Sequence, residues 1–489
     1  MTTRNVNVTR NEVCFVSKSK DKVKIEFVGK SGDGVTGSMY YITFNDKQIL
    51  LEAGLYQTSG DDILKQYKVN NRNYKVPFAD LDAVIISHFH IDHCGVIPYL
   101  FARGYRGNVY IPKGNKQLAR IMWEDSLKIF ESDCVKLEKR YGMNATPLYT
   151  QEDIEIALEH LVELPFGEDI VLFDDLVLRY YHASHIVNAA QVHMTFKLGE
   201  TVKRLGFTGD IGSDIEKDYI LPYEPLPYCD ILLAECTYGG SHKTHKQKDR
   251  DKDLEKIKCV VDQCCQHDTQ KVLFGSFSLN RLQDILTTLY KIYGDDETFA
   301  TPVIIDAPLG MKISALWDKL IEKDYDLWKK VSTWKNIVWV NTYEESQQWQ
   351  KLQTSQVIIS TSNFLKNGRV VSWLKSILPN ENARVCLCGY AGDEDSVAYQ
   401  IQHSKKWVTI DGERVRSRAN VMQLTSFSSH ACRSELLQRY TDIQYNKIYL
   451  VHSESNGKQE FAKMLRDSLS KADRSAKVHT PVMGDKISF

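Results

Sequence analysis

Short apolar runs alternate with polar turns from Lys22 to about Asp210. Gly, Asn and Asp residues separate these runs, which is typical of strands bounded by turns. Two longer segments, residues 115–137 and 151–161, instead place their apolar residues on one helical face. We therefore predict helices packed on a sheet in this region. The strand-like runs are residues 23–27, 49–51, 83–86 and 109–111.

Residues from about Tyr228 to His403 repeat the alternation in the order strand, helix, strand. This order predicts a parallel sheet within an inserted α/β domain. Further strand-like runs at 408–410, 421–424 and 448–451 predict that the chain then returns to the first domain. The predicted division is 1–225 for the first part of a core domain, 226–404 for the inserted domain and 405–489 for the return.

The chain has 489 residues, 43% of them hydrophobic, which is enough for two or three domains with cores of their own. Its formal net charge is −1, so a nucleic acid has to be bound by a local basic groove rather than by overall charge. The densest basic stretch, His242 to Lys258, interleaves its cations with Asp and Glu. We interpret it as a solvated loop leading into a surface helix.

The chain shows no sign of a membrane segment. Residues 1–22 are polar, and no run approaches the roughly 18 apolar residues that span a bilayer. The 11 cysteines are an odd number without a secretion signal, which favours reduced thiols. We expect a soluble, cytoplasmic protein with no membrane partner.

The segment S-H-F-H-I-D-H-C-G directly follows the apolar run 83–86. On an extended chain His88 and His90 project to the same side, and a tight turn after them brings Asp92 and His93 round to the same point. Imidazole and carboxylate side chains at this spacing predict two neighbouring metal sites.

Two further residues of ligand type follow strand-like runs. His185 comes after residues 176–181, and Asp210 closes the sequence L-G-F-T-G-D. A carboxylate between two metal ions can bridge them. Imidazole and carboxylate without cysteine suit Zn²⁺ and leave room for water, and manganese fits on ligand type alone.

This order of motifs resembles the metallo-β-lactamase fold, an αββα sandwich. Six later segments resemble, in order, the signatures of its β-CASP branch, which carries an inserted α/β domain and processes nucleic acids. The chain is most similar to the endonucleases of polyadenylation complexes and their prokaryotic relatives. The six segments are Ala234 to Gly239, Phe277 to Gln283, Asp306 to Pro308, Gly368-Arg369, Ser426 to Leu437 and Val451 to Glu454.

The resemblance implies a role for each candidate residue. One zinc ion is held by His88, His90 and His185, the other by Asp92, His93 and His452, with Asp210 between them. Glu235 orients His430, which protonates the leaving oxygen, and Asp92 also counts as a catalytic group. Arg281, Arg369 and Ser428 are candidate substrate contacts, since arginine suits phosphate. Taken alone, each arginine more often lies in a salt bridge, Glu235 could be a turn carboxylate, His430 a helix-end residue, and His182 is left as structural.

Four positions depart from the family pattern. Glu52 stands where the family usually has Asp, and Ser362-Asn363-Phe364 where Ser-Gly-Met is usual. Gly275 stands where Pro is common, and Cys432 where Asp commonly follows the His-Ala pair. These changes concern the metal site's surroundings and the substrate cleft.

The predicted function is zinc-dependent hydrolysis of RNA phosphodiester bonds by two-metal hydroxide attack. The predicted mode is endonucleolytic, with 5′-to-3′ exonucleolytic cleavage as a second mode, on single-stranded RNA, by a homodimer or within an RNA-processing complex. A DNA nuclease is the alternative, but His452 stands where DNA-repair members usually have an apolar residue. A non-catalytic scaffold is disfavoured because every ligand position is filled, and a small-molecule hydrolase because the insertion is large.

Overall fold

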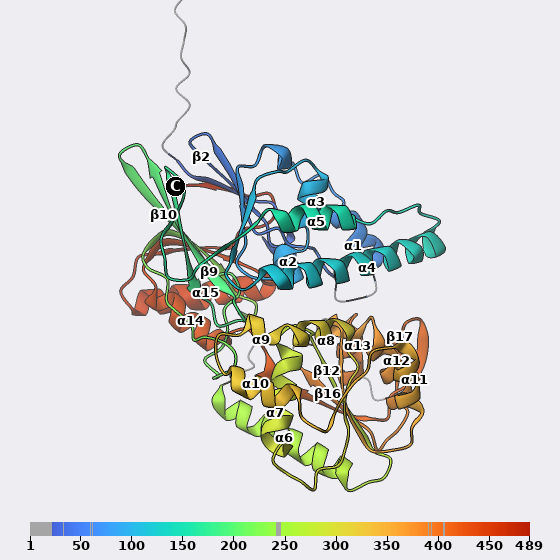
Figure 1. Cartoon of the computed structure of the whole chain (residues 1–489). Helices are drawn as coiled ribbons and strands as arrows, with labels where there is room; N and C mark the ends of the chain where they lie inside the picture. Colours follow the sequence, from blue (N-terminus) through green and yellow to red (C-terminus); the bar gives the residue numbers. More distant parts are fainter. Residues whose placement is uncertain are drawn as a thin grey trace, which may run out of the picture.

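The computed structural model describes residues 22–32, 34–58, 60, 62–240, 246–389, 391–392, 394–403 and 406–489. Most of the polar N-terminal segment, and the first residues of the basic stretch that begins at His242, therefore lie outside the described residues. Figure 1 shows two lobes: segments from both ends of the chain form the upper lobe, and the middle of the chain forms the lower one. The α/β class with an inserted domain is confirmed.

One core sheet has the strand order β22-β1-β2-β3-β4-β5-β6. Neighbours from β22 to β3 are antiparallel, and β3 to β6 run parallel. β4 is buried along its whole length, as expected for a continuous apolar run, and it ends just before the histidine cluster. The strands are β1 (Lys24–Phe27), β2 (Tyr40–Phe44), β3 (Lys47–Leu51), β4 (Ala83–Ile85), β5 (Asn108–Pro112), β6 (Leu161–Leu164) and β22 (Lys486–Ser488).

The second core sheet has the order β21-β20-β11-β10-β9-β8-β7. Its inner face packs on the first sheet through aromatic pairs: the rings of Tyr40 and Phe207 lie 5.4 Å apart, and those of Phe44 and Phe196 lie 4.9 Å apart. The strands are β7 (Ile170–Phe173), β8 (Leu176–His182), β9 (Ala190–Leu198), β10 (Thr201–Phe207), β11 (Cys229–Glu235), β20 (Tyr445–Val451) and β21 (Lys477–His479).

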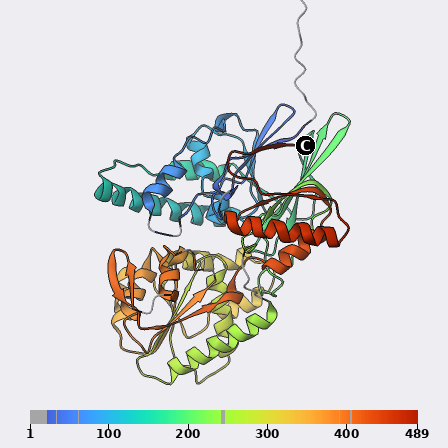
Figure 2. The same ribbon diagram turned by 180° about the vertical axis from the view of Figure 1, so that it is seen from behind.

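Helices cover the outer faces of both core sheets, which completes the αββα sandwich. Helices α3, α4 and α5 pack on the first sheet (Figure 1), and α14 and α15 on the second (Figure 2). The two helices predicted from periodicity are α4 and α5. Gly142 caps the C-terminal end of α4 with a φ of 62°, a left-handed conformation that suits glycine. A capping box between Thr150 and Asp153 begins α5. The helical elements of the core are η1 (Lys30–Gly32), α1 (Ile63–Asn70), η2 (Phe78–Asp80), α2 (Ile91–Cys94), α3 (Ile97–Ala102), α4 (Lys116–Tyr141), α5 (Gln151–Glu159), α14 (Arg433–Asp442) and α15 (Ser455–Lys471).

The lower lobe is built on a six-stranded parallel sheet of order β14-β13-β15-β12-β16-β19. Helices lie on both of its faces, so β12 is fully buried. The strands are β12 (Lys271–Ser276), β13 (Val303–Ile305), β14 (Ile337–Trp339), β15 (Gln356–Thr361), β16 (Arg384–Cys388) and β19 (Asn420–Leu424). The helical elements are α6 (Gln247–Cys265), α7 (Arg281–Tyr293), α8 (Pro308–Ala315), α9 (Trp317–Leu320), α10 (Tyr325–Ser332), α11 (Tyr343–Lys351), η3 (Asn363–Leu365), α12 (Arg369–Ile377), α13 (Val397–His403) and η4 (Thr425–Phe427).

The sheet of the inserted domain continues past the predicted boundary at residue 404. β17 (Trp407–Ile410) and β18 (Glu413–Arg416) form a two-stranded ribbon, and β19 then pairs with β16 as the last strand of the six-stranded sheet. Residues 421–424 were expected in the returning core segment. Their apolar pattern identifies a strand but does not specify which sheet edge it joins. The boundary near residue 225 stays a prediction.

The chain leaves and re-enters the core through neighbouring strands. β11 precedes the insertion and β20 follows it, and the two pair in parallel with Glu235 opposite Val451. Because parallel neighbours end at the same sheet edge, this pairing brings residues near 235 beside residues near 452. Among the described residues, no helix combines the length and apolar character that a membrane crossing requires.

Candidate metal centre

Loops that follow strand ends in both core sheets converge at one site. It gathers all seven predicted ligands: His88 and His90 after β4, Asp92 and His93 in α2, His185 after β8, Asp210 after β10 and His452 after β20. Five of the seven are buried, and His90 and Asp92 are half-buried. Buried polar side chains that converge in this way need partners, and a metal ion is the simplest common one.

One group of ligand atoms consists of three imidazoles and Asp210, which all approach within 4.8 Å of one another. His90 Nδ1 lies 3.2 Å from His88 Nε2 and 3.1 Å from His185 Nε2. The Oδ2 atom of Asp210 lies 3.7 Å from His88 Nε2 and 3.6 Å from His185 Nε2. Three nitrogens and one carboxylate oxygen match the ligand set of a zinc site.

A second group consists of Asp92, His93 and His452. His452 Nε2 lies 3.2 Å from Asp92 Oδ2 and 3.4 Å from His93 Nε2. Asp210 borders this group as well, since its Oδ2 atom lies 3.4 Å from His93 Nε2. Asp210 therefore stands between the two groups.

The Asp210 carboxylate provides the test of whether a cation fits here. It is 2% exposed, and its Oδ1 atom has no hydrogen-bond partner among the described residues. Burial alone would raise the pKa of Asp210, but the charges of His452 and His93 hold it well below its usual range. A buried, ionised carboxylate with an unsatisfied oxygen is costly unless a cation neutralises it. The residues therefore fit a bound metal ion.

The imidazoles nearest one another are held in their metal-binding form. Burial lowers the pKa of His90 to about 4 and the pKa values of His88 and His185 well below their usual range. These rings are neutral at pH 7, and the neutral ring is the one that offers a lone pair to a metal.

Four of the predicted histidine ligands are oriented by a contact at Nδ1, one of the two ring nitrogens. Ser87 Oγ lies 3.0 Å from His88 Nδ1, and the Ser429 carbonyl lies 3.2 Å from His185 Nδ1. Such outer contacts set which nitrogen faces the metal. The other two partners are Glu52, which accepts a bond from His93 Nδ1, and Thr237, whose Oγ1 lies 2.9 Å from His452 Nδ1.

Glu52 occupies the centre of one such network although it is longer than the family's usual Asp. It is fully buried after β3 and accepts bonds from the amide of Ser87 at 2.6 Å and from its hydroxyl at 3.0 Å. Its backbone lies in the left-handed region at φ 61°. This backbone turn places the longer side chain where it meets His93.

Glu235 and His430 form a separate pair beside the ligands. Glu235 Oε1 lies 3.2 Å from His430 Nδ1, and the carboxylate also accepts the amides of Ile211 at 2.9 Å and Thr237 at 2.8 Å. The opposite nitrogen, His430 Nε2, lies 4.0 Å from Asp210 Oδ2. This bond leaves His430 Nε2 turned toward the predicted metal ligands, and the role of Glu235 in orienting a catalytic His430 stays a prediction.

The predicted substrate contacts are all engaged within the protein. Arg281 is buried, donates to the Cys388 carbonyl at 2.9 Å and lies over the Phe277 ring. Arg369 pairs with Asp306 at 2.7 Å and also donates to the Val340 carbonyl at 2.9 Å. Their contact with substrate stays a prediction.

Ser428, the third predicted substrate contact, is buried beside the proposed acid. Its hydroxyl accepts the His430 amide at 3.3 Å and donates to the Tyr238 hydroxyl at 3.0 Å. These bonds favour a role in placing His430, and a contact between Ser428 and substrate stays a prediction. His182, which was left as structural, stacks on Phe166 and belongs to no ligand group among the described residues.

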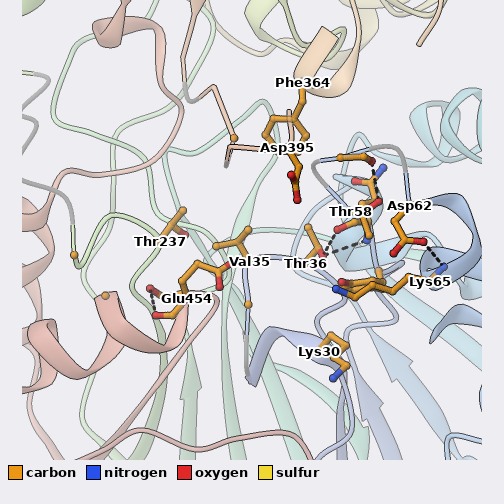
Figure 3. A pocket seen from close by; sticks show the side chains of 18 of the residues that line it. Lys30, Val35, Thr36, Thr58, Asp62, Lys65, Thr237, Phe364, Asp395 and Glu454 are labelled. Atoms are coloured by element: carbon orange, nitrogen blue, oxygen red, sulfur yellow. Dashed lines mark hydrogen bonds between the residues drawn. The ribbon is translucent and has the colours of Figure 1, made fainter. Parts of the chain in front are cut away.

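A cleft of about 1430 Å³ lies beside this site, between the two lobes. Thr237, Tyr238 and Ser453 line it, so it begins next to His452 and His430. Figure 3 shows Thr237 and Glu454 on one side, Thr58 and Asp62 on the other, and Phe364 and Asp395 entering from the inserted domain. Residues of both lobes therefore line this cleft.

Models of three protein families match successive parts of the chain. Residues 32–262 match the metallo-beta-lactamase superfamily, residues 282–401 the Beta-Casp domain, and residues 414–481 a Zn-dependent metallo-hydrolase RNA specificity domain. Ribonuclease TTHA0252 of Thermus thermophilus is 30% identical over 88% of this chain and 93% of its own length. The chain belongs to the β-CASP branch of the metallo-β-lactamase superfamily.

Other members of this branch match at lower identity. Transcription termination factor FttA of Methanocaldococcus jannaschii is 24% identical over 91% of this chain and 69% of its own length. Integrator complex subunit 11 of Danio rerio is 26% identical over 90% of this chain and 70% of its own length. A crystal structure of a protein of unknown function from Enterococcus faecalis shares the fold, with a TM-score of 0.50 and 11% identity over 96% of this chain and all of that one.

The family motifs include the predicted ligands but did not identify several residues that form hydrogen bonds with them. Ser87 and Thr237 were not identified, although Ser87 precedes the first ligand and Thr237 lies in the T-Y-G segment after β11. Their adjacency to β-CASP motifs was the available signal. The contact of Ser429 with His185 runs through a backbone carbonyl, so no side-chain pattern could have revealed it.

Proposed function

We propose that this protein is a zinc-dependent nuclease that hydrolyses phosphodiester bonds of single-stranded RNA. The observation that carries the proposal is the position of Asp210, buried and ionised between two groups of ligand atoms. His88, His90 and His185 would hold one zinc ion, and Asp92, His93 and His452 the other, with Asp210 shared. When bound, such ions activate water and neutralise charge that develops on a phosphoryl group.

The chain's own residues supply the proton transfer. The Glu235 carboxylate accepts a bond from His430 Nδ1, which leaves Nε2 facing the ligands. A phosphodiester held at the centre therefore has a positioned acid for its leaving oxygen, and general acid catalysis by histidine suits neutral pH. Burial alone would raise the pKa of Glu235, but the neighbouring charge of His430 keeps it below its usual value, so Glu235 stays an anion that supports the protonated ring.

RNA is favoured over DNA by the segment that supplies His430 and His452. Both residues lie in residues 414–481, which match an RNA specificity domain. The relative with the highest identity given above is named a ribonuclease. We expect cytoplasmic action, and homodimerisation or membership of an RNA-processing complex is a prediction that light scattering of the purified protein checks.

The test uses zinc-loaded protein with matched single-stranded RNA and DNA labelled at either end. Internal RNA fragments that a chelator abolishes would support an endoribonuclease, and mononucleotides released from the 5′ end would support the exonucleolytic mode. Cleavage of DNA but not RNA would show that DNA, and not RNA, is the substrate. Cleavage of neither polymer would contradict the proposal. Elemental analysis of the same sample gives the metal and its stoichiometry, with two zinc ions expected.

A further inference from the structure

The charges of the described residues that line the cleft do not explain how a polyanion is held there. Among the described lining residues, Lys30 and Lys65 are outnumbered by Asp62, Asp395 and Glu454. The whole chain carries a formal charge of −1. Away from the predicted metal site, the described lining residues therefore supply little phosphate affinity, because that affinity comes from neutralising phosphates with cations. A single-stranded nucleic acid has one other common means of attachment, which is stacking of its bases on aromatic rings.

An aromatic ring stands in the cleft on the loop between β15 and α12. Phe364 lines the cleft and is half-buried. Figure 3 shows its ring entering the cleft from the inserted domain, beside Asp395. The next residue, Leu365, is 3% exposed and belongs to the core of the inserted domain. Leu365 thus packs into this core, while the Phe364 ring packs edge-on against Phe277, with centroids 6.4 Å apart, and also lines the cleft.

The backbone of this loop is strained in a way that sets the ring's position. Phe364 has φ 53° and ψ 20°, and Leu365 has φ 61°, two successive residues in the left-handed region that disfavours side chains. Such strain persists only where surrounding contacts impose it, and it concentrates at ligand sites.

Two glycines make room for this strained pair. A Cβ atom at Gly275 would lie 2.8 Å from Leu365 Cδ2, and a Cβ atom at Gly392 would lie 2.9 Å from Phe364 Cδ1. Gly275 and the Asn363-Phe364 pair are both departures from the family pattern, and Gly275 lies against Leu365, the residue that follows Phe364. Gly275 thus leaves room for the Leu365 side chain in the turn that presents Phe364.

Further contacts hold the loop rigid. The amide of Ser362 bonds to the Ser276 carbonyl at 3.1 Å, and Ser362 Oγ accepts the Asn367 amide at 3.1 Å. Lys366 Nζ reaches across to the core domain, where it donates to the carbonyls of Thr58 and Gly60. A loop anchored in both domains loses little freedom when a ligand stacks on its ring, which favours binding.

We propose that Phe364 is the stacking platform for one nucleobase of a single-stranded substrate, and so a specificity-determining residue of this protein. The proposal rests on the proposed function, because it names how the same cleft holds its substrate. A base paired inside a duplex cannot reach the ring, so this contact selects an unpaired nucleotide. Asp395, beside the ring, suits a base amino group better than a phosphate.

The test measures binding, so that it does not depend on turnover. A fluorescent single-stranded RNA is titrated onto zinc-loaded protein that carries His430→Ala to prevent cleavage. Adding Phe364→Ala is expected to weaken binding about 10- to 100-fold. Phe364→Leu, which keeps apolar volume without an aromatic face, is expected to weaken it similarly, and Phe364→Tyr to retain most of it. The matched control is Tyr343→Ala, since Tyr343 is 52% exposed in the same domain and does not line the cleft.

An abasic scan of the RNA identifies the stacked base. With Phe364 present, removing the base at one position should weaken binding, and with Phe364→Leu the same removal should have no effect. The salt dependence of binding should not change, because Phe364 neutralises no phosphate. Equal binding by the Phe364→Leu and parent proteins, equal abasic effects in both, or no binding of RNA by the parent would overturn the proposal.

The outcome separates this proposal from the proposed function. If RNA binds with the expected abasic pattern but zinc-loaded protein with His430 intact does not cut it, the stacking site stands and the nuclease assignment fails. If RNA is cut and Phe364→Leu changes neither binding nor KM, the nuclease assignment stands and the stacking site fails.

Discussion

The Nδ1 atom of His430 lies 3.2 Å from the Oε1 atom of Glu235, a residue 195 positions earlier in the chain. Because Glu235 also accepts two backbone amides, its position does not depend on His430. We therefore expect His430→Ala to fold normally, to keep its metal content and to lower kcat about 100- to 10,000-fold. Cleavage assays and elemental analysis of one preparation check both statements.

Glu235→Gln provides the control for this assignment. The amide keeps the shape of the side chain but removes the charge that stabilises a protonated His430, so kcat should fall less than in His430→Ala. The double variant should show nearly the same fall in kcat as His430→Ala alone. Metal loss in His430→Ala would show instead that Asp210, Glu235 and His430, which also lie within 4.8 Å of one another, form a ligand group.

Local sequence patterns predicted many elements because each depends on neighbouring residues. The apolar run 83–86 became β4, and the periodic segment 151–161 became α5. The cluster of predicted ligands was also local, since four of the seven lie within six residues. Pattern and motif order were enough for these features.

The strand pairings and side-chain contacts that the sequence did not predict depend on segments far apart in the chain. The strand at 421–424 was recognised, but its pairing with β16 is a choice between sheet edges. The sequence made Arg369 a candidate phosphate contact, which stays a prediction, but it could not reveal the ion pair of Arg369 with Asp306, 63 residues away. The bond between Thr237 and His452 spans 215 residues and follows only from the parallel pairing of β11 with β20.

Glu52→Ala should weaken zinc binding without removing a ligand. Glu52 accepts a bond from His93 Nδ1 and holds the amide of Ser87, which precedes His88. Loss of such an outer contact typically lowers metal affinity about 10- to 100-fold. Competition with a chromogenic chelator measures the change. Glu168→Ala, at an exposed position, is the control, and unchanged affinity in Glu52→Ala would remove Glu52 from the site.

Metal binding should stabilise the folded protein through the predicted ligands. A ligand that binds only the native state adds about 2.7 kcal/mol at one hundred times its dissociation constant. Zinc should therefore raise the unfolding temperature of the parent protein. Asp92→Ala and His452→Ala should each show a smaller rise and lower zinc content, since both residues belong to the second ligand group. An undiminished rise in both variants would argue against that group.

Arg369→Ala should destabilise the inserted domain. The Asp306 carboxylate is fully buried, and Arg369 is its charged partner at 2.7 Å, while Trp373 Nε1 donates to it at 2.7 Å. Removing the guanidinium leaves a buried charge without its counter-ion, which costs about 3 kcal/mol or more. Urea unfolding measures the loss. A stable Arg369→Ala protein with weakened RNA binding would instead restore the phosphate contact predicted from the sequence.

Lys217 should make stability rise with pH in an alkaline window. Its side chain is half-buried, but its Nζ atom is shielded from solvent and has no hydrogen-bond partner in the described part of the chain. Burial lowers the pKa of Lys217 to about 8 from 10.5. Between these values the unfolded chain holds a proton that the folded protein has released, so the free energy of unfolding increases with pH. Below pH 8 Lys217 is charged in both states, so its buried charge lowers the free energy of unfolding by the full amount.

Lys217→Met removes this buried charge and tests the argument. At pH 7 the variant should be more stable than the parent by up to about 3 kcal/mol, the value of the pKa difference. The advantage should shrink as the pH rises above 8 and vanish above about 10.5, where the parent's Lys217 is neutral in both states. Urea unfolding of both proteins at several pH values measures the difference. An advantage that stays constant with pH would show that it comes from packing of the methionine, and a loss of stability at pH 7 would mean that the charged ammonium is paired in solution.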